Sequence, residues 1–442
     1  MPLIEGASPV QLEQLARIRE VLLHIERNYV DPVQDRQLVG GCRQGMLRLA
    51  PTASISEPSA TVDGPRAIQQ IGADYVAVQQ QKPGGAEDEK LADACMDGMV
   101  RTLDGQSAFW NVQAFKDLQS GGAGIGIELR LESGRLIVVT AIDGGPAWKA
   151  GLSRGDVIVQ IDGAAIGGPS LSQAIKPLLG PPGTQVTLTL KHPGFQQPMA
   201  FVLTREVIAI ETVKRALLPG GIAYIRITQF QERTGEKLAN AITAASAENQ
   251  GDLSGLILDL RNNPGGLLNA CVAVSAAFLP HNALVVFTDG YSEDSRMRLY
   301  ASKEYYLRRN QEDYVGKLPS SLRKVLPMVV LVDQDTAACP EIVAAALQDH
   351  KRATILGVRT FGVETVQTLL PLKDGAALKL TTARYFRPSG GPIGPAGITP
   401  DVVLNKGADK TELSYNTLPS DDPAVARAVE VLHKKASAAK PK

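Results

Sequence analysis

Residues 333–367 read DQDTAACPEIVAAALQDHKRATILGVRTFGVETVQ, and this stretch decides how the C-terminal half of the chain is interpreted. The apolar run VVLVD at 329–333 predicts a buried strand, and IVAAALQDH at 342–350 predicts a helix. Pro340 suits the first turn of that helix, where a backbone N–H has no helical partner. A strand, a tight turn and a helix N-terminus form the arrangement in which many folds present a nucleophile. The later segment 357–367 would bring a second loop alongside.

The length and composition indicate an ordinary globular protein with several domains. The 442 residues are too many for one hydrophobic core and suggest two to four domains. Hydrophobic residues make up 44% and charged residues 21%, which is typical of soluble proteins. Because the formal net charge is zero, no global field favours nucleic acid or an anionic membrane. No apolar run reaches the roughly 18 residues of a membrane span, so we expect no integral membrane segment.

The start of the chain and its cysteines and histidines bear on cellular location and on metal binding. The opening MPLIEGASPVQLEQL lacks the basic-then-apolar signature of a signal peptide, so the protein is cytoplasmic or the chain begins after a removed signal. The cysteines show no CxxC spacing and the histidines no HExxH pair. We therefore expect neither a metal site nor a cofactor.

The N-terminal region is predicted to be helical. Apolar residues recur at helical spacing within 9–50, and Asp31-Pro32 separates a first helix from a second that runs through Met46. Residues 51–89 are rich in Ala, Ser, Pro and Gln, which predicts a flexible insertion.

Two segments of this region repeat each other. LVGGCRQGMLRL at 38–49 and LADACMDGMVRT at 91–102 match at five positions, including Cys42/Cys95 and Gly45/Gly98. Either a duplicated helix pairs with its copy, with or without a disulfide between the two cysteines, or common helix composition produced the match by chance. A disulfide would need Cα atoms within about 7 Å.

The rest of the chain divides into a β-rich unit and an alternating one. Residues 121–208 contain alternating strand-like runs bounded by Gly, Pro and Asp. From 209 onward strand runs alternate with helical patterns at 232–248, 267–278 and 340–349, which predicts an α/β domain with a buried sheet. The end, 433–442, is basic and predicts a solvated tail.

The β-rich unit resembles a PDZ domain. GGPAWKAGLSRGDVIVQIDGAAI at 144–166 carries the resemblance, and four residues stand in the position of the carboxylate-binding loop: Gly124, Ile125, Gly126 and Ile127. Glycines let consecutive N–H groups converge on an anion, and the next strand offers an edge for an extended peptide.

A glycine-rich turn lies further along. GLILDLRNNPGG at 255–266 predicts a buried strand that turns into a helix at Gly265 and Gly266. Such a turn exposes N–H groups that can hold an oxyanion, although it can also be a sharp turn without a catalytic role.

Together these motifs resemble the carboxyl-terminal processing peptidases (tail-specific proteases, peptidase family S41). The similarity covers 20–50 and 91–405 and includes DLRNNPGGLLNACVAVSAAFL, EIVAAALQDHKRATILG, LTTARYFRPSG and GITPDV. The resemblance implies an α+β and α/β multidomain fold with N-terminal helices, a PDZ domain and a ClpP/crotonase-like α/β core with a β-rich cap. The implied domains are 1–120, 121–208 and 209–405, followed by a C-terminal tail at 406–442.

The family's catalytic positions are altered in this chain. The family carries a nucleophilic serine before the EIVA helix, a lysine base 25 residues later and an orienting glutamine four residues after the lysine. The resemblance maps these positions to Ala338, Val363 and Gln367, so only the glutamine is retained. Cys339 takes the place of the small residue whose N–H would join Gly265 and Gly266 in the oxyanion site. A further departure is GPIG at 391–394, where the family commonly shows GRSIQ.

These departures favour a pseudopeptidase, with two other functions left open. The preferred partners are protein C-terminal tails, an active family paralogue or adaptor protein, or a second copy through the N-terminal helices. The second function is an active serine-type or Cys339-dependent endopeptidase that processes protein C-termini with displaced chemistry. At Cys339 itself we expect a small packed thiol and not a nucleophile. The third function is a PDZ adaptor. The resemblance also implies a periplasmic or extracytoplasmic location.

Overall fold

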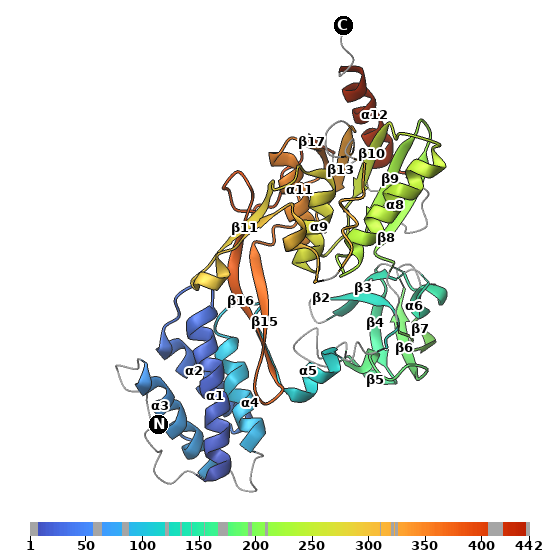
Figure 1. Ribbon diagram of the computed structural model, residues 1–442. Coiled ribbons are helices and arrows are strands. Elements are labelled where there is room, and N and C mark those ends of the chain that lie inside the picture. Colours follow the sequence, from blue (N-terminus) through green and yellow to red (C-terminus); the bar gives the residue numbers. More distant parts are fainter. Residues whose placement is uncertain are drawn as a thin grey trace. The chain divides into compact units, whose positions relative to one another are not determined.

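The computed structural model describes most of the chain in two compact units, one formed by residues 1–111 with 212–442 and the other by 112–211 (Figure 1). The described residues are 8–55, 64–81, 88–119, 123–132, 135–142, 144–153, 155–166, 176–192, 197–207, 211–309, 311–319, 322, 326–404 and 419–438. No helix within these ranges is long and apolar enough to span a membrane.

A six-stranded, mostly parallel sheet forms the centre of the larger unit. Its order is β17-β14-β13-β10-β9-β8, and only the edge strand β8 runs antiparallel. The strands are β8 (Val213–Leu218), β9 (Ile222–Ile227), β10 (Gly255–Asp259), β13 (Met328–Val332), β14 (Thr354–Gly357) and β17 (Val402–Val403). Every residue of β9, β10, β13 and β14 is buried, as near-continuous apolar runs predict for a sheet covered on both faces.

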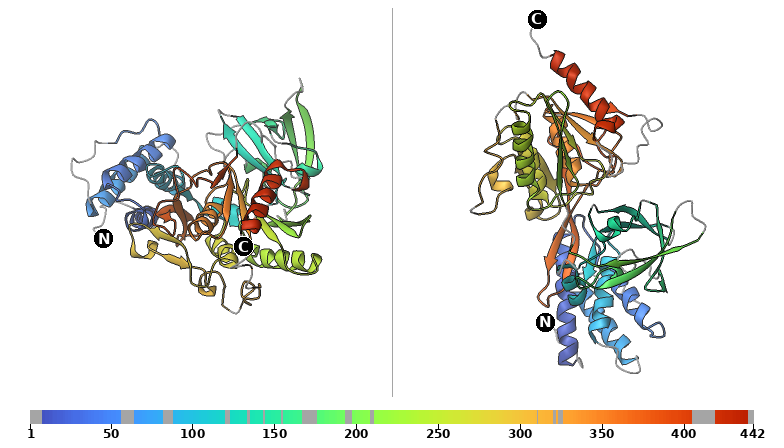
Figure 2. Two further views of the ribbon diagram at one scale, coloured as in Figure 1. Left: turned by 90° about the horizontal axis from the view of Figure 1, so that it is seen from above. Right: turned by 90° about the vertical axis from the view of Figure 1, so that its right-hand side faces the viewer.

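Helices cover both faces of this sheet (Figure 2). One face packs against α8 (Thr234–Glu248), α9 (Leu268–Phe278) and α11 (Cys339–Asp349), close to the three predicted helical segments. The other face packs against α12 (Pro423–Ala438).

Helix α12 corrects the prediction of a solvated C-terminal tail. Ala424, Val425, Ala428 and Leu432 are buried against the sheet, and the helix continues to Ala438. The basic composition of 433–442 obscured this packing, because the apolar residues that anchor the helix precede it. Residues 439–442 lie outside the described residues.

A second sheet extends from the core towards the N-terminal helices (Figure 1). Its order is β1-β16-β11-β12, with β15 also paired to β16. The strands are β1 (Ala108–Trp110), β11 (Leu284–Asp289), β12 (Arg298–Tyr300), β15 (Thr365–Pro371) and β16 (Ala377–Phe386), and 3₁₀ turns lie at Glu293–Ser295, Lys303–Tyr305 and Pro419–Asp421. The Val30 N–H donates to Thr381 O at 2.9 Å and joins this sheet to the helices.

The repeated segments pair with each other, as the first interpretation expected. They form α2 (Asp35–Leu49) and α4 (Asp88–Val100). Helix α1 (Pro9–Asn28) precedes α2, and α3 (Pro65–Gln80) precedes α4. The α2 and α4 backbones touch where glycines remove the side chains, because a Cβ on Gly45 would lie 1.9 Å from Ala94 O. Next to this crossing Cys42 and Cys95 form a disulfide with Cα atoms 3.9 Å apart.

Helix α3 contradicts the flexible insertion predicted for 51–89. Ile71, Tyr75 and Val78 are fully buried, and the Arg43 guanidinium pairs with the buried Asp74 carboxylate at 2.5 Å. These apolar residues recur at helical spacing within an Ala- and Gln-rich composition that resembles a linker. Residues 56–63 and 82–87 lie outside the described residues.

The smaller unit is a β-rich domain with its own core. Its strands pair in the order β2-β3-β4-β6-β7, with β5 on β4. The strands are β2 (Ile127–Glu132), β3 (Arg135–Ala141), β4 (Val157–Ile161), β5 (Ala164–Ala165), β6 (Gln185–Lys191) and β7 (Met199–Thr204). The helical elements are α5 (Val112–Gln119), α6 (Pro146–Lys149) and a 3₁₀ turn at Lys176–Leu178. All of these strands lie within 121–208, where the sequence predicts strand-like runs.

Candidate functional site

The turn between β13 and α11 is built around Asp333. Its carboxylate accepts hydrogen bonds from the Thr336 hydroxyl at 2.9 Å and from the Asn262 N–H at 3.0 Å. Burial raises the pKa of Asp333, although these hydrogen bonds oppose the effect. The carboxylate therefore ties this turn to the glycine-rich turn that follows β10.

Ala338 occupies the end of this turn in a conformation that L-residues rarely adopt. Its φ is +61° and its ψ is −113°, directly before the first residue of α11. For a residue with a side chain this backbone conformation costs free energy, and it persists only when the surrounding structure holds it. The Ala338 methyl is half-buried, so the position borders on solvent. The chain thus keeps a strained, partly accessible strand-to-helix turn with a methyl group at its tip.

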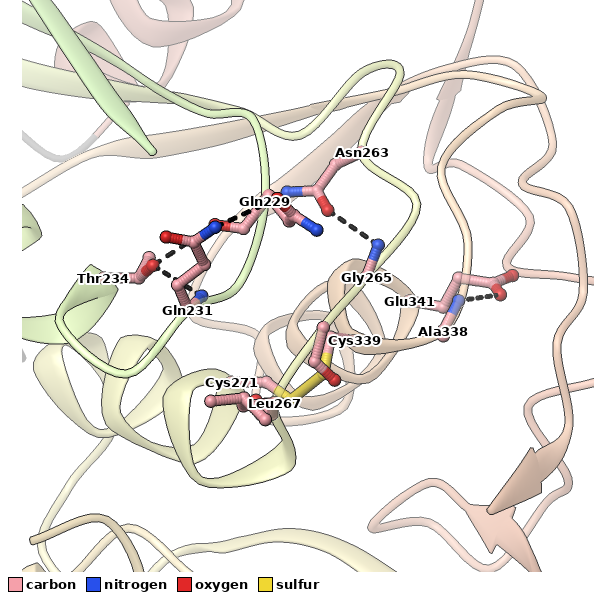
Figure 3. Close-up of a disulfide and its surroundings, with 11 residues drawn as sticks. Gln229, Gln231, Thr234, Asn263, Gly265, Leu267, Cys271, Ala338, Cys339 and Glu341 are labelled. Carbon is pink, nitrogen blue, oxygen red and sulfur yellow. Dashed lines mark hydrogen bonds between the residues drawn. A yellow bond between two sulfur atoms is a disulfide. The ribbon is translucent and has the colours of Figure 1, made fainter. Parts of the chain in front are cut away.

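The glycine-rich turn docks directly onto Ala338 (Figure 3). The Ala337 N–H donates to Asn263 O at 3.0 Å, and a Cβ built on Gly265 would lie 3.1 Å from the Ala338 Cβ. Asn263 is fully buried, and its amide oxygen accepts the Gly265 N–H at 2.9 Å. The structure therefore brings Gly265 and Ala338 together.

Gly266 requires glycine for a separate reason. Its φ is +140°, and an added Cβ would lie 2.0 Å from Phe230 O. Neither the Gly266 N–H nor the Cys339 N–H donates a hydrogen bond to any described residue. These amides, unlike that of Gly265, are therefore free to donate to an anion beside Ala338.

Cys339 is not the packed free thiol that the sequence suggested. It forms a disulfide with Cys271 of α9, with Cα atoms 5.6 Å apart, and both cysteines are buried (Figure 3). The two residues are 68 positions apart, so only the packing of α9 against α11 brings them together. A disulfide sulfur carries no thiolate and is not a nucleophile.

Val363 is linked to the turn through Glu341. The Val363 N–H donates to the Glu341 carboxylate at 2.9 Å, and so does the Ala338 N–H at 2.9 Å. One side chain thus holds the two positions that the sequence maps onto the family's serine and lysine. Phe361 adds a second link, because its N–H donates to Thr336 O at 3.0 Å.

Gln367 lies on β15 among polar side chains from other segments. Its amide nitrogen lies 2.8 Å from the Thr381 hydroxyl and 3.2 Å from the Gln106 amide oxygen. Its amide oxygen is buried and accepts no hydrogen bond within the described part of the chain. A buried acceptor without a donor is costly. Among the described residues, the Gln367 side chain hydrogen-bonds to Gln106, Thr365 and Thr381, and not to Ala338 or Val363.

The other departure from the family pattern, at 391–394, packs against the Val363 loop. A Cβ on Gly394 would lie 2.5 Å from the Glu364 Cβ and 2.8 Å from Gly362 O. Ile393 is buried, and its N–H donates to Tyr385 O at 3.3 Å. Sequence changes about 30 positions apart therefore meet in one place.

A buried ion cluster lies at the base of the glycine-rich turn. The Arg261 guanidinium donates to Asp259 at 2.6 Å and to Asp422 at 2.7 Å. Burial alone would raise the pKa of Asp259, but Arg261 and Arg226 outweigh it and lower the pKa to about 2. Asp422 also accepts the Ala424 N–H at 2.8 Å, so the cluster anchors the first turn of α12.

The predicted peptide-binding loop lies in the other unit. Gly124 exchanges two backbone hydrogen bonds with Glu206, at 3.0 and 2.9 Å. The Ile125 and Gly126 amides donate to no described residue, while Ile127 begins β2. Two consecutive amides without an acceptor among the described residues form the donor pair that a carboxylate needs.

Sequence reasoning missed two groups at the site. No role in holding the turn was predicted for Glu341, although an acidic residue at the third position of a helix is the reciprocal half of a capping box. Cys271 was not connected to Cys339, since no local signal pairs cysteines that lie this far apart in sequence.

Comparison with known proteins places these motifs in one family. The model of peptidase family S41 matches residues 221–404, and that of the PDZ domain matches 137–191. The carboxy-terminal-processing protease of Bartonella bacilliformis is 37% identical over 344 residues, 77% of this chain and 75% of that protein. Carboxy-terminal processing protease CtpA of Bacillus subtilis is 33% identical over 343 residues, 76% of this chain and 67% of that protein.

A solved structure of a related protease supports the same family assignment. The photosystem II D1 C-terminal processing protease matches with a TM-score of 0.58 and 29% identity, over 92% of this chain and 96% of that one. The family and the multidomain fold predicted from the sequence, with a PDZ domain and an S41-type core, are therefore confirmed.

Proposed function

This chain belongs to peptidase family S41, the family of the carboxy-terminal processing proteases, and we propose that it is a member that binds protein C-terminal tails without cutting them. The observation that carries the proposal is Ala338, a methyl group at the tip of the strained turn where the resemblance expects a serine. The turn and its glycine partner persist, while the reactive group does not.

The chemistry of the two altered positions supports the loss of catalysis. A methyl group has no lone pair with which to attack a carbonyl, and valine accepts no proton. Losing the nucleophile of a serine peptidase lowers turnover by about 10⁶-fold. The free Gly266 and Cys339 amides can still stabilise an oxyanion, but such sites alone retain only about 10³–10⁴-fold catalysis over water.

The PDZ unit supports the binding part of the proposal. The free Ile125 and Gly126 amides would donate to the terminal carboxylate of a bound tail, and the adjacent strand would pair with its backbone. The bound tail would belong to a client protein or to an active paralogue of the family. A second copy, joined through the N-terminal helices, is the third partner that we propose to test.

The second candidate function is a Cys339-dependent endopeptidase, and the relatives named as proteases favour it. The Cys271–Cys339 disulfide argues against it, because attack would first require reduction to a thiolate. A third possibility is a PDZ adaptor in which the core serves only as structure.

Protease assays separate the first two functions. Purified protein is incubated with casein, with and without a dithiol reductant, beside the Cys339→Ala variant. No cleavage in any sample supports the proposal. Cleavage that appears on reduction and disappears in Cys339→Ala would establish the cysteine peptidase instead.

Peptide titrations test the binding. Pairs of peptides with a free or an amidated C-terminus are titrated by calorimetry. Carboxylate capture requires that amidation weaken binding, by roughly tenfold or more for a lost charge-assisted hydrogen bond. Equal binding of the two forms would contradict tail recognition by the PDZ loop.

We also propose an extracytoplasmic location, and the two disulfides support it because such bonds persist in oxidising compartments. Alkylation of free thiols in intact cells, followed by mass spectrometry, tests this. Four alkylated cysteines in the native protein would count against it.

A further inference from the structure

Glu341 is a fully buried carboxylate at the third position of α11. No described lysine, arginine or histidine forms an ion pair with it. Four hydrogen-bond donors compensate its burial instead. The two oxygens of a carboxyl group offer enough acceptor sites for this set of donors.

The two carboxylate oxygens of Glu341 divide these donors in a specific way. Oε2 accepts the Ala338 N–H and the Val363 N–H, both at 2.9 Å. Oε1 accepts the Thr360 hydroxyl at 2.5 Å and the Gly362 N–H at 2.8 Å. A single oxygen atom therefore holds both positions at which the family's reactive groups are replaced.

This pattern exceeds ordinary helix capping. A glutamate at the third position of a helix commonly accepts one N–H from its own N-cap residue, which here is Ala338. The other three donors come from residues 360–363, beyond the end of the helix. The contact continues to a third segment, because the Thr360 hydroxyl accepts the Ile398 N–H at 2.7 Å.

We propose that Glu341 is the positioning residue of this site. Its carboxylate holds Ala338 in the strained conformation and fixes the distance between that turn and the Val363 loop. The inference goes beyond the proposed function, because it holds whether or not the protein cleaves peptides. It also explains why the two loops keep their relation without a serine–lysine contact: the connection runs through a side chain that takes no part in the chemistry.

Replacement by glutamine tests this role with almost no change in shape. A glutamine amide offers one oxygen and one NH₂ group, so it can serve the donors of only one side. On the other side the NH₂ group would face two donors, either the Ala338 and Val363 N–H groups or the Gly362 N–H and the Thr360 hydroxyl. Glu341→Gln should therefore release either Ala338 with Val363 or Thr360 with Gly362.

Hydrogen–deuterium exchange resolved to single amides measures this release. Loss of a hydrogen bond to a charged group should raise exchange at the released amides by about 10- to 100-fold. A matched control is Asp349→Asn at the other end of α11, where Asp349 accepts the Ser389 N–H at 2.9 Å and pairs with Arg387. The control should raise exchange at Ser389 and leave Ala338 and Val363 unchanged.

Two results would overturn the proposal. One is unchanged exchange in Glu341→Gln at all three amides, those of Ala338, Gly362 and Val363. The other is an equal rise along the whole of α11 in both variants, which indicates a purely structural carboxylate. If Glu341→Gln does not fold, the near-isosteric variant Thr360→Val tests the proposal in its place. It removes the Thr360 hydroxyl, one of the two donors to Glu341 Oε1. The proposal then requires faster exchange at Gly362 together with Ala338, and a change confined to Thr360 and its own neighbours contradicts it.

Discussion

Restoring the two missing side chains is the most direct test of the site. The change is the double substitution Ala338→Ser with Val363→Lys. Serine adds one oxygen to a Cβ that is already present at φ +61°, so the backbone accepts it without new strain. That Cβ faces Gly265, beside the free Gly266 and Cys339 amides. The lysine would extend from a backbone fixed by the hydrogen bond of the Val363 N–H to Glu341.

The size of the effect follows from what each residue supplies. A positioned general base contributes about 10²–10⁴-fold, and the nucleophile and its base act as a unit. We therefore expect each single variant to remain at background and the double variant to cleave casein at least about 100-fold faster than either. Partial desolvation at this half-buried position would also lower the pKa of the new lysine towards that of a working base.

The assay is the release of labelled casein fragments, with folding checked by thermal unfolding and the Cys271–Cys339 bond checked by mass spectrometry. Adding Gln367→Ala provides an internal control. The orphan Gln367 amide oxygen is the acceptor that the lysine would need, so this change should lower the regained activity. A folded, disulfide-bonded double variant that stays at background would refute the view that only the reactive groups have been lost.

Three further predictions concern stability. Gly45→Ala should destabilise the protein by about 1–3 kcal/mol in urea unfolding, because the new methyl would meet Ala94 O at the crossing of α2 and α4. Gly40→Ala on the same helix meets nothing within 4 Å and should be neutral or slightly stabilising, so equal effects would contradict the crossing. The folded-state pKa of Asp259 is about 2, below its ordinary value of 3.8, so its stabilisation is present above about pH 4 and lost as the pH falls towards 2. This loss is about 2 kcal/mol, and unfolding curves that are flat over this range would argue against the buried pair. Asp422→Ala should cost about 3–5 kcal/mol and release α12 to proteolysis, because it removes one partner of the buried Arg261. If α12 resisted proteolysis in this variant as well as in the unmodified protein, Asp422 would not be what anchors the helix.

The sequence predicted the elements whose signals are local. Apolar runs located β10 and β13, and helical periodicity located α8, α9 and α11, because burial on a strand or helix repeats within a few residues. The PDZ and S41 motifs identified the family in the same way. The predictions were wrong where we gave amino-acid composition more weight than helical periodicity. These places are α3, within the Gln-rich insertion, and α12, near the basic C-terminus.

The sequence by itself determined that positions 338 and 363 carry no reactive side chain, since a methyl and an isopropyl group lack reactive atoms in any fold. Only the tertiary structure decided what holds those positions. The pairing of Cys339 with Cys271 and the convergence of four donors on Glu341 join segments far apart in the chain. Contacts of this kind depend on how whole helices and loops pack, and no local pattern of residues records that packing.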